Sequence, residues 1–234
     1  MPSRNILKIF VEDGYYHIYN RGANRDAIFK DIQDYRVFLT YLKTYLLPKD
    51  EVKLRALISN PSVSEQEKEI YKNLLRLHNF HNQVKLLAYC LMPNHFHLLV
   101  RQQSKTAIEH FMRALITRYV LYFNKRQNKV GPLFQGKYKA VLVESEQQLL
   151  YVSKYIHRNP LKLANPLLTD RNPIEGQPSS YPVYIGHVKQ VWVHPEYVIT
   201  PNQKRIVSYR SFVEEKSLGE DRVFIEGMMI DEND

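Results

Sequence analysis

The most informative stretch of the chain reads Leu91-Met92-Pro93-Asn94-His95-Phe96-His97-Leu98-Leu99-Val100. Its Pro-Asn pair predicts a turn between two apolar runs, residues 84–91 and 95–101, which are expected to form a β-hairpin. Side chains alternate along a strand, so His95 and His97 share one face and Phe96 turns to the other. The stretch therefore predicts a strand with an apolar stripe on one face and two imidazoles on the opposite face.

The elements expected around this hairpin follow a known order. Strands are expected at 14–20 and 137–144, and helices at 34–47, 105–126 and 145–159. Residues 49–82 have the character of an insertion, with one helical patch behind a capping box of Ser64 and Glu67. Without the insertion, the first six elements match the split β-α-β pattern of ferredoxin-like folds. We therefore expect an α+β protein with a ferredoxin-like (RRM-like) antiparallel sheet and helices.

The length of 234 residues fits one domain with an extension. Residues 1–165 are expected to form the main domain. Prolines cluster from about residue 166, which predicts a C-terminal extension, residues 166–234, of short strands or loops with an acidic end.

The charge of the chain is unevenly distributed. Lys and Arg number 33 and Asp and Glu 24, which gives a net charge of +9. Residues 211–234 hold eight acids and two bases, or −6, so the other 210 residues carry +15. A strongly basic body attracts polyanions, of which nucleic acid is the commonest. The alternative interpretation is that the positive charge only keeps the protein soluble and binds no nucleic acid.

Cysteine usage and hydropathy narrow the class of protein. The single cysteine, Cys90, excludes an internal disulfide framework and a multi-cysteine zinc site. No stretch approaches the ~18 consecutive apolar residues of a membrane span, and residues 1–14 lack a signal-peptide pattern. We therefore expect no membrane partner and a cytoplasmic protein, associated with the nucleoid if it binds DNA.

Two patterns could carry chemistry. His95 and His97, one strand step apart, could chelate a divalent ion, although such pairs are more often two half-exposed histidines. Tyr151, Tyr155 and Asn159 follow one stripe of the helix at 145–159, where packing is the simpler interpretation. If the two patterns meet, Mg²⁺ or Mn²⁺ held by both histidines and Asn159 could polarise a phosphodiester for attack by Tyr155.

No other catalytic pattern competes with this one. The sequence has no Gly-rich phosphate loop, no nucleophile-elbow serine and no His-Glu-x-x-His helix. A phenol ionises near pH ~10, so attack by a tyrosine needs deprotonation, and the sequence identifies no base.

The chain resembles the single-tyrosine HUH transposases, and among them it is most similar to the REP-associated tyrosine transposases. The resemblance covers roughly residues 14–186 and rests on the segments at 16–22, 91–100, 134–139 and 155–160, with Ser179-Ser180-Tyr181 and Gly186 behind them. The specific combination is a His-hydrophobic-His strand followed by a Tyr-x-x-x-Asn-Pro helix. The insertion and the chain beyond residue 186 lie outside these motifs.

The resemblance implies an HUH endonuclease fold in residues 1–165 that cuts and rejoins single-stranded DNA at hairpins or palindromic repeats. It implies that His95 and His97 are metal ligands, that Asn159 supplies the third ligand, and that Tyr155 is the nucleophile. The product would be a 5′-phosphotyrosine with a free 3′-hydroxyl. Tyr151 is the rival nucleophile, but only Tyr155 stands four residues before the Asn-Pro pair. Dimeric relatives exchange the tyrosine helix, so a homodimer stays open.

Basic side chains near these motifs are candidate DNA contacts, because phosphate contacts supply most of the salt-sensitive affinity for DNA. The candidates are Arg21, Arg118, Lys137, Lys139, Lys154 and Arg158. For about half of such residues a solvated surface is the simpler interpretation. His17 could equally be a strand residue that packs.

Three alternatives to a transposase stay open at this point. The first is a non-cleaving module that binds DNA or RNA hairpins and was domesticated from a transposase. The second is a replication or relaxase-type initiator with the same chemistry. The third is a structural protein that binds metal incidentally.

Overall fold

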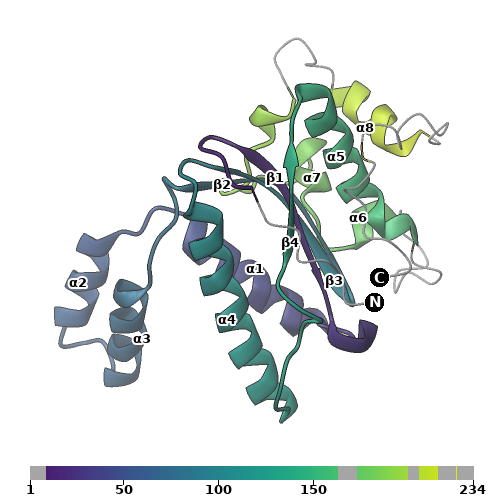
Figure 1. Ribbon diagram of the computed structural model, residues 1–234. Helices are drawn as coiled ribbons and strands as arrows, with labels where there is room; N and C mark the ends of the chain where they lie inside the picture. Colours follow the sequence, from purple (N-terminus) through teal and green to yellow (C-terminus); the bar gives the residue numbers. More distant parts are fainter. Residues whose placement is uncertain (1–8, 163–172, 200–205, 216–224, 226–234) are drawn as a thin grey trace.

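The structure is a computed structural model, and it describes residues 9–162, 173–199, 206–215 and 225 (Figure 1). The expected acidic end of the chain lies outside these residues. Among the described residues, no helix combines the length and the apolar character needed to cross a membrane. The boundary expected between residues 165 and 166 stays a prediction.

Four antiparallel strands form one sheet in the order β2-β3-β1-β4. The strands are β1 (Tyr15–Arg21), β2 (Val84–Met92), β3 (His95–Gln102) and β4 (Lys139–Val143). With α1 (Ile32–Leu46) between β1 and β2, and α4 (Ala107–Gln127) between β3 and β4, the chain follows the β-α-β-β-α-β order. This confirms the expected α+β, ferredoxin-like sheet.

Helices α1 and α4 cover one face of the sheet (Figure 1). Phe96, Leu98 and Val100 of β3 are fully buried on this face, as the alternation predicted. The ring of Phe96 lies 5.5 Å from that of Phe38 in α1, measured between centroids. Helix α1 begins where the Asp31 carboxylate accepts hydrogen bonds from two backbone amides of the first turn. The main apolar core therefore lies between this face of the sheet and helices α1 and α4.

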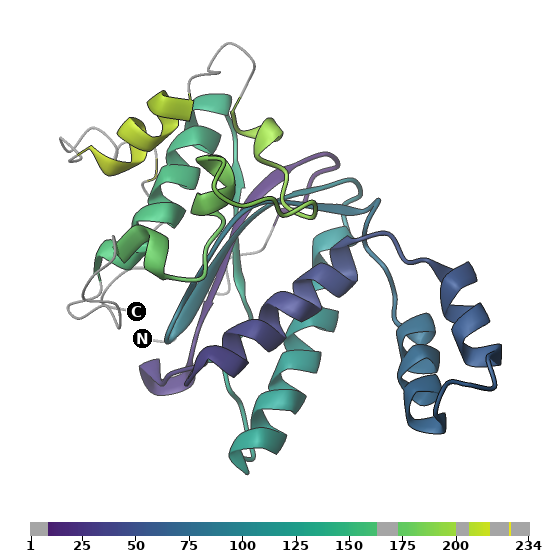
Figure 2. The same ribbon diagram turned by 180° about the vertical axis from the view of Figure 1, so that it is seen from behind.

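Helix α5 (Glu146–Arg158) and the C-terminal segment cover the opposite face (Figures 1 and 2). A β-bulge in β2 between Leu86 and Ala88 turns both Leu87 and Ala88 toward this side. The segment contains η2 (Asn159–Lys162), α6 (Pro173–Gly176), α7 (Tyr181–Tyr184), η3 (Pro195–Tyr197) and α8 (Ile206–Glu214).

The described part of the C-terminal extension contains the predicted loops, but it forms short helices where short strands were expected. Only two isolated bridges are strand-like, Cys90 with Ser179 and Leu86 with Val193. Short helices form because aromatic residues such as Tyr184 and Tyr209 bury against α5. Tertiary burial of this kind overrides the local signal of the prolines, which are accepted in a first helical turn.

The insertion at 49–82 is a helical hairpin that projects away from the sheet (Figure 2). It consists of α2 (Glu51–Ser59) and α3 (Glu65–Arg76), neither of which has a buried residue. The predicted capping box is present: Ser64 Oγ accepts from the Glu67 amide, and the Glu67 carboxylate accepts from the Ser64 amide.

Candidate active site

The two histidines of β3 lie on the face that α5 covers. Their ring centroids are 5.0 Å apart, and His97 is fully buried whereas His95 is half-buried. His95 lies directly after the turn at Pro93 and Asn94 and is the first residue of β3. The pair therefore combines an interior imidazole with one nearer the surface.

Tyr155 of α5 lies against this pair. The Tyr155 ring stands edge-on to His97, with centroids 5.5 Å apart, and the phenol-bearing side chain is 8% exposed. Helix α5 begins at Ser145, whose hydroxyl accepts from the Gln148 amide, and its apolar stripe packs on the sheet. The fold thus brings Tyr155 of the second pattern next to His97 of the first.

Tyr151 lies one turn earlier on α5 and contacts a different element. Its ring is 5.4 Å from that of Phe212 in α8. The ring of His97 contacts that of Tyr155, with centroids 5.5 Å apart. Of the two tyrosines, Tyr155 is therefore the one that the fold sets beside the histidines.

Asn159 follows α5 as its C-terminal cap and is 1% exposed. Its amide nitrogen donates to the backbone carbonyl of Tyr155 at 2.9 Å. Because the nitrogen serves the last turn of the helix, the amide oxygen is the atom that could act as a ligand. Helix η2, which begins with Asn159, packs against β2, the neighbour of β3.

His17 of β1, for which the sequence left packing as an equal alternative, lies beside His97. It is fully buried, and its Nε2 lies 2.9 Å from Nδ1 of His97. Alternation along β1 predicts that His17, Tyr19 and Arg21 share a face. Their proximity to His97 follows only from the sheet order, in which β1 lies beside β3.

The donor set fits an oxygen-preferring divalent ion that also binds substrate. Nδ1–H of His95 donates to Asn94 Oδ1 at 2.7 Å, so a neutral His95 ring carries its proton on Nδ1 and its lone pair on Nε2. Among the described residues, no three His, Cys, Asp or Glu side chains form a metal-binding group. The two imidazoles and the amide oxygen that the resemblance implies as ligands suit Mg²⁺ or Mn²⁺ completed by phosphate oxygens better than a closed zinc site.

Cys90 does not add to this donor set. It pairs with His97 across the β2–β3 ladder, but it is fully buried, and burial raises the pKa of its thiol. A neutral thiol is a poor ligand and a poor nucleophile. Its position agrees with the expectation of a core residue.

Three of the expected DNA contacts, Arg21, Lys137 and Lys139, lie on β1, on β4 or just before β4. Arg21 stands opposite His95 in the β1–β3 register. Lys139 stands opposite Tyr19 in the β1–β4 register, and its Nζ lies 5.9 Å from the centre of the Tyr19 ring. Lys137 is exposed just before β4. DNA binding by these three residues stays a prediction.

The other three expected contacts interact within the protein. Arg118 of α4 stacks on Tyr41 at 4.0 Å, on the opposite side of the sheet from Tyr155. Lys154 is 6% exposed, with its Nζ 4.5 Å from the centre of the Phe212 ring. These positions lie on helix faces that other helices cover.

Arg158 ends α5 and also points into the protein. Its guanidinium donates to the backbone carbonyls of Val213 and Glu215 at the end of α8. Cations suit the carbonyl end of a helix, so this contact ties α8 to α5. DNA binding by Arg118, Lys154 and Arg158 stays a prediction.

A third buried histidine, His157, fixes α5 to the C-terminal segment. Its Nδ1 lies 2.7 Å from the Tyr209 hydroxyl, and its Nε2 lies 2.8 Å from Ser180 Oγ. Burial lowers the pKa of His157 to about 3, so the ring is neutral at pH 7. The Ser180 hydroxyl also accepts from the backbone amide of Tyr89 in β2.

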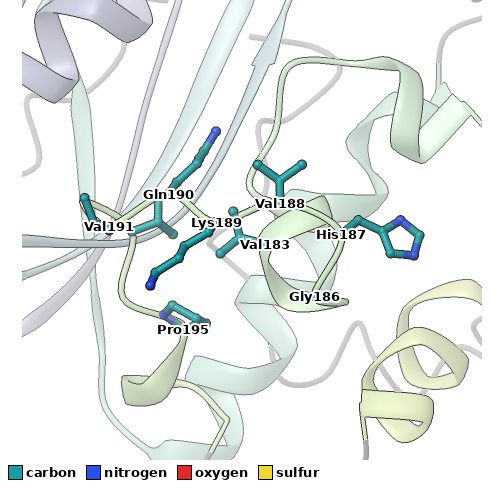
Figure 3. Close-up of a pocket in the computed structure, with 9 residues that line it drawn as sticks. Val183, Gly186, His187, Val188, Lys189, Gln190, Val191 and Pro195 are labelled. Atoms are coloured by element: carbon teal, nitrogen blue, oxygen red, sulfur yellow. The ribbon is translucent and has the colours of Figure 1, made fainter.

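A surface hollow of about 560 Å³ lies in the C-terminal segment (Figure 3). It is formed by residues between Val183 and Pro195, and none of the expected site residues lines it. The hollow is therefore separate from the group around Tyr155.

Residues 10–159 match the family described as "Transposase IS200 like". The chain belongs to this family. The matched range includes His95, His97, Tyr155 and Asn159. No curated protein matches the chain. Among solved structures, a REP-associated tyrosine transposase bound to a REP hairpin is similar at 9% identity and a TM-score of 0.43, covering 81% of this chain and 96% of that one.

Proposed function

We propose that this transposase-family protein is a metal-dependent endonuclease and strand transferase for single-stranded DNA, with Tyr155 as its nucleophile. The observation that carries the proposal is the position of the Tyr155 ring, 5.5 Å from His97 and on the same face as His95. Its motifs resemble those of REP-associated tyrosine transposases, so DNA with a hairpin or palindromic repeat is the proposed substrate. Such a substrate associates the protein with the nucleoid.

The proposed reaction exchanges one phosphodiester for another. The phenol oxygen of Tyr155 attacks phosphorus and loses its proton as the P–O3′ bond breaks. The departing 3′-oxygen takes up a proton, which leaves a 5′-phosphotyrosine and a free 3′-hydroxyl. A 3′-hydroxyl can reverse the attack and rejoin strands without a nucleotide cofactor, because the phosphotyrosine conserves the bond.

The remaining side chains hold the phosphate and the ion. His95, His97 and Asn159 would hold Mg²⁺ or Mn²⁺, which supplies Lewis-acid polarisation of the phosphate when bound. Arg21 of β1 and Lys139 of β4 would contact phosphates that flank the scissile one. Residues 1–165 would contain this machinery, and a homodimer stays a prediction.

Adduct formation tests this function. The full chain is incubated with a pool of single-stranded hairpin DNAs carrying their flanks and Mg²⁺ or Mn²⁺, then separated by denaturing electrophoresis. We expect a covalent protein–DNA adduct that Tyr155→Phe abolishes, because phenylalanine keeps the ring contacts and lacks the nucleophilic oxygen. Tyr151→Phe is the matched control and should leave the adduct intact.

A non-cleaving hairpin-binding module predicts a different outcome. It would bind hairpins tightly and salt-sensitively without an adduct, and neither Tyr155→Phe nor a chelator would change the affinity. That result would replace the proposed enzyme with a binding protein.

Variants of the expected ligands distinguish a loss of metal binding from a loss of protein stability. His95→Ala should remove cleavage with little loss of stability, because His95 is at a half-exposed strand end. Asn159→Ala should weaken the metal dependence more than DNA binding. If His95→Ala cleaves at the wild-type rate, the metal assignment is wrong.

A further inference from the structure

Two buried imidazoles meet edge to edge between β1 and β3. The ring planes of His17 and His97 differ by 17° and their centroids are 5.1 Å apart, whereas Nε2 of His17 and Nδ1 of His97 are 2.9 Å apart. Nitrogens much closer than ring centres mean that the rings share an in-plane N–H···N hydrogen bond. Both side chains are fully buried.

The direction of this hydrogen bond decides whether His97 can bind a metal. Between two neutral rings only one of the facing nitrogens carries a proton. If Nε2–H of His17 donates, neutral His97 carries its own proton on Nε2. If Nδ1–H of His97 donates, Nε2 of His97 keeps its lone pair and can act as a ligand.

We propose that His17 is a positioning residue that accepts a hydrogen bond from Nδ1–H of His97 and so presents Nε2 of His97 to the metal. This inference rests on the proposed function, since it needs His97 to be a ligand. His95 is oriented in the same way by Asn94 Oδ1 at 2.7 Å. The two candidate histidine ligands thus have separate orienting partners. The partner of His95 is an amide near the surface, and the partner of His97 is a buried imidazole.

His17 also holds the rings around the nucleophile. Its ring lies edge-on to that of Tyr155, with centroids 5.9 Å apart, and 5.1 Å from that of Tyr19. A side chain without an acceptor at position 17 would fill the space and leave Nδ1–H of His97 buried with no partner from β1. Removing such an orienting partner typically weakens metal affinity by about 10–100-fold.

The experiment compares Mn²⁺ binding in three versions of the full chain by electron paramagnetic resonance of free Mn²⁺. His17→Phe keeps a ring but has no acceptor, and its affinity should fall about 10–100-fold. His17→Gln offers an amide oxygen and should stay within a few-fold of wild type. Circular dichroism melts of each variant separate a folding defect from a loss of affinity.

A second measurement uses the wild-type protein alone. Long-range ¹H–¹⁵N spectra of the histidine rings, recorded with Mg²⁺, should show the proton of His97 on Nδ1. Unchanged Mn²⁺ affinity in His17→Phe would overturn the inference and leave the proposed nuclease standing. A proton on Nε2 of His97 would overturn the inference together with the assignment of His97 as a metal ligand, while the adduct on Tyr155 would still test the nucleophile. Absence of Mn²⁺ binding by the wild type would overturn the inference together with the metal-dependent function.

Discussion

The two faces of the sheet bury different kinds of side chain. Toward α1 and α4 the buried side chains are mainly apolar and aromatic, such as Phe38 and Phe96, and Asp34 and Gln102 serve the beginnings of the helices. Toward α5 the same degree of burial encloses His17, His97 and His157. Burial on both faces stabilises the fold, and burial on the second face also holds polar groups in fixed orientations.

Adjacent residues of β3 show this division most clearly. Phe96 and His97 are both fully buried but face opposite helical layers. Only the second touches Tyr155, with ring centroids 5.5 Å apart.

The largest expected effect is on stability at Phe96. Phe96→Ala should reduce the free energy of unfolding by about 3–5 kcal/mol, because it leaves a cavity between Phe38 and Phe134. His97→Gln should cost less, about 1–3 kcal/mol, while removing cleavage. Urea unfolding measures both. A larger loss in His97→Gln than in Phe96→Ala would contradict the division between the faces.

The next effect concerns pH and His157. Its pKa is about 3 when folded and about 6.5 when unfolded, so the unfolded chain takes up a proton first as the pH falls. Stability from this group is complete above about pH 6.5 and is lost toward pH 3, by about 2 kcal/mol between pH 7 and pH 5.

The groups around His157 stay neutral over this range. Tyr209 and Ser180 carry hydroxyls, and burial raises the pKa values of Tyr181, Tyr184 and Tyr209. His157→Gln should flatten the fall in stability, measured by urea unfolding in EDTA at pH 7 and pH 5. The exposed His110→Gln is the control and should keep the wild-type slope. An unchanged slope in His157→Gln would show that other groups cause the acid sensitivity.

The smallest effect is expected in α2 and α3 of the insertion, neither of which has a buried residue. Ser64→Ala removes one partner of the capping box and should destabilise α3 by about 1 kcal/mol. Amide hydrogen exchange in residues 65–76 should accelerate, while the melting temperature of the sheet stays unchanged. A lowered global melting temperature would mean that the insertion is coupled to the core.

Much of this arrangement could be predicted because local patterns carry it. The alternation of side chains along a strand placed His95 and His97 on the face opposite Phe96. The four-residue spacing of Tyr155 and Asn159 placed both on one stripe of a helix. The contact between His17 and His97 could not be predicted in this way, since it depends on β1 lying next to β3. Local spacing does not encode sheet order.

The surroundings of the basic residues could not be predicted from local sequence spacing either. Lys154 and Arg158 follow the nucleophile in sequence, but α8 packs over them and engages their charges. Whether a cation faces solvent depends on which distant segment covers its helix. The helices of the C-terminal segment were missed for the same reason, because they form by burial against α5.

The most direct test of the central claim is to locate the covalent bond. The adduct formed with hairpin DNA and Mn²⁺ is digested with nuclease and trypsin, and the modified peptide is sequenced by tandem mass spectrometry. We expect a nucleotide linked through its 5′-phosphate to the Tyr155 oxygen. A nucleotide on Tyr151 or on any other residue would contradict the assignment of Tyr155 and of the face it shares with His97.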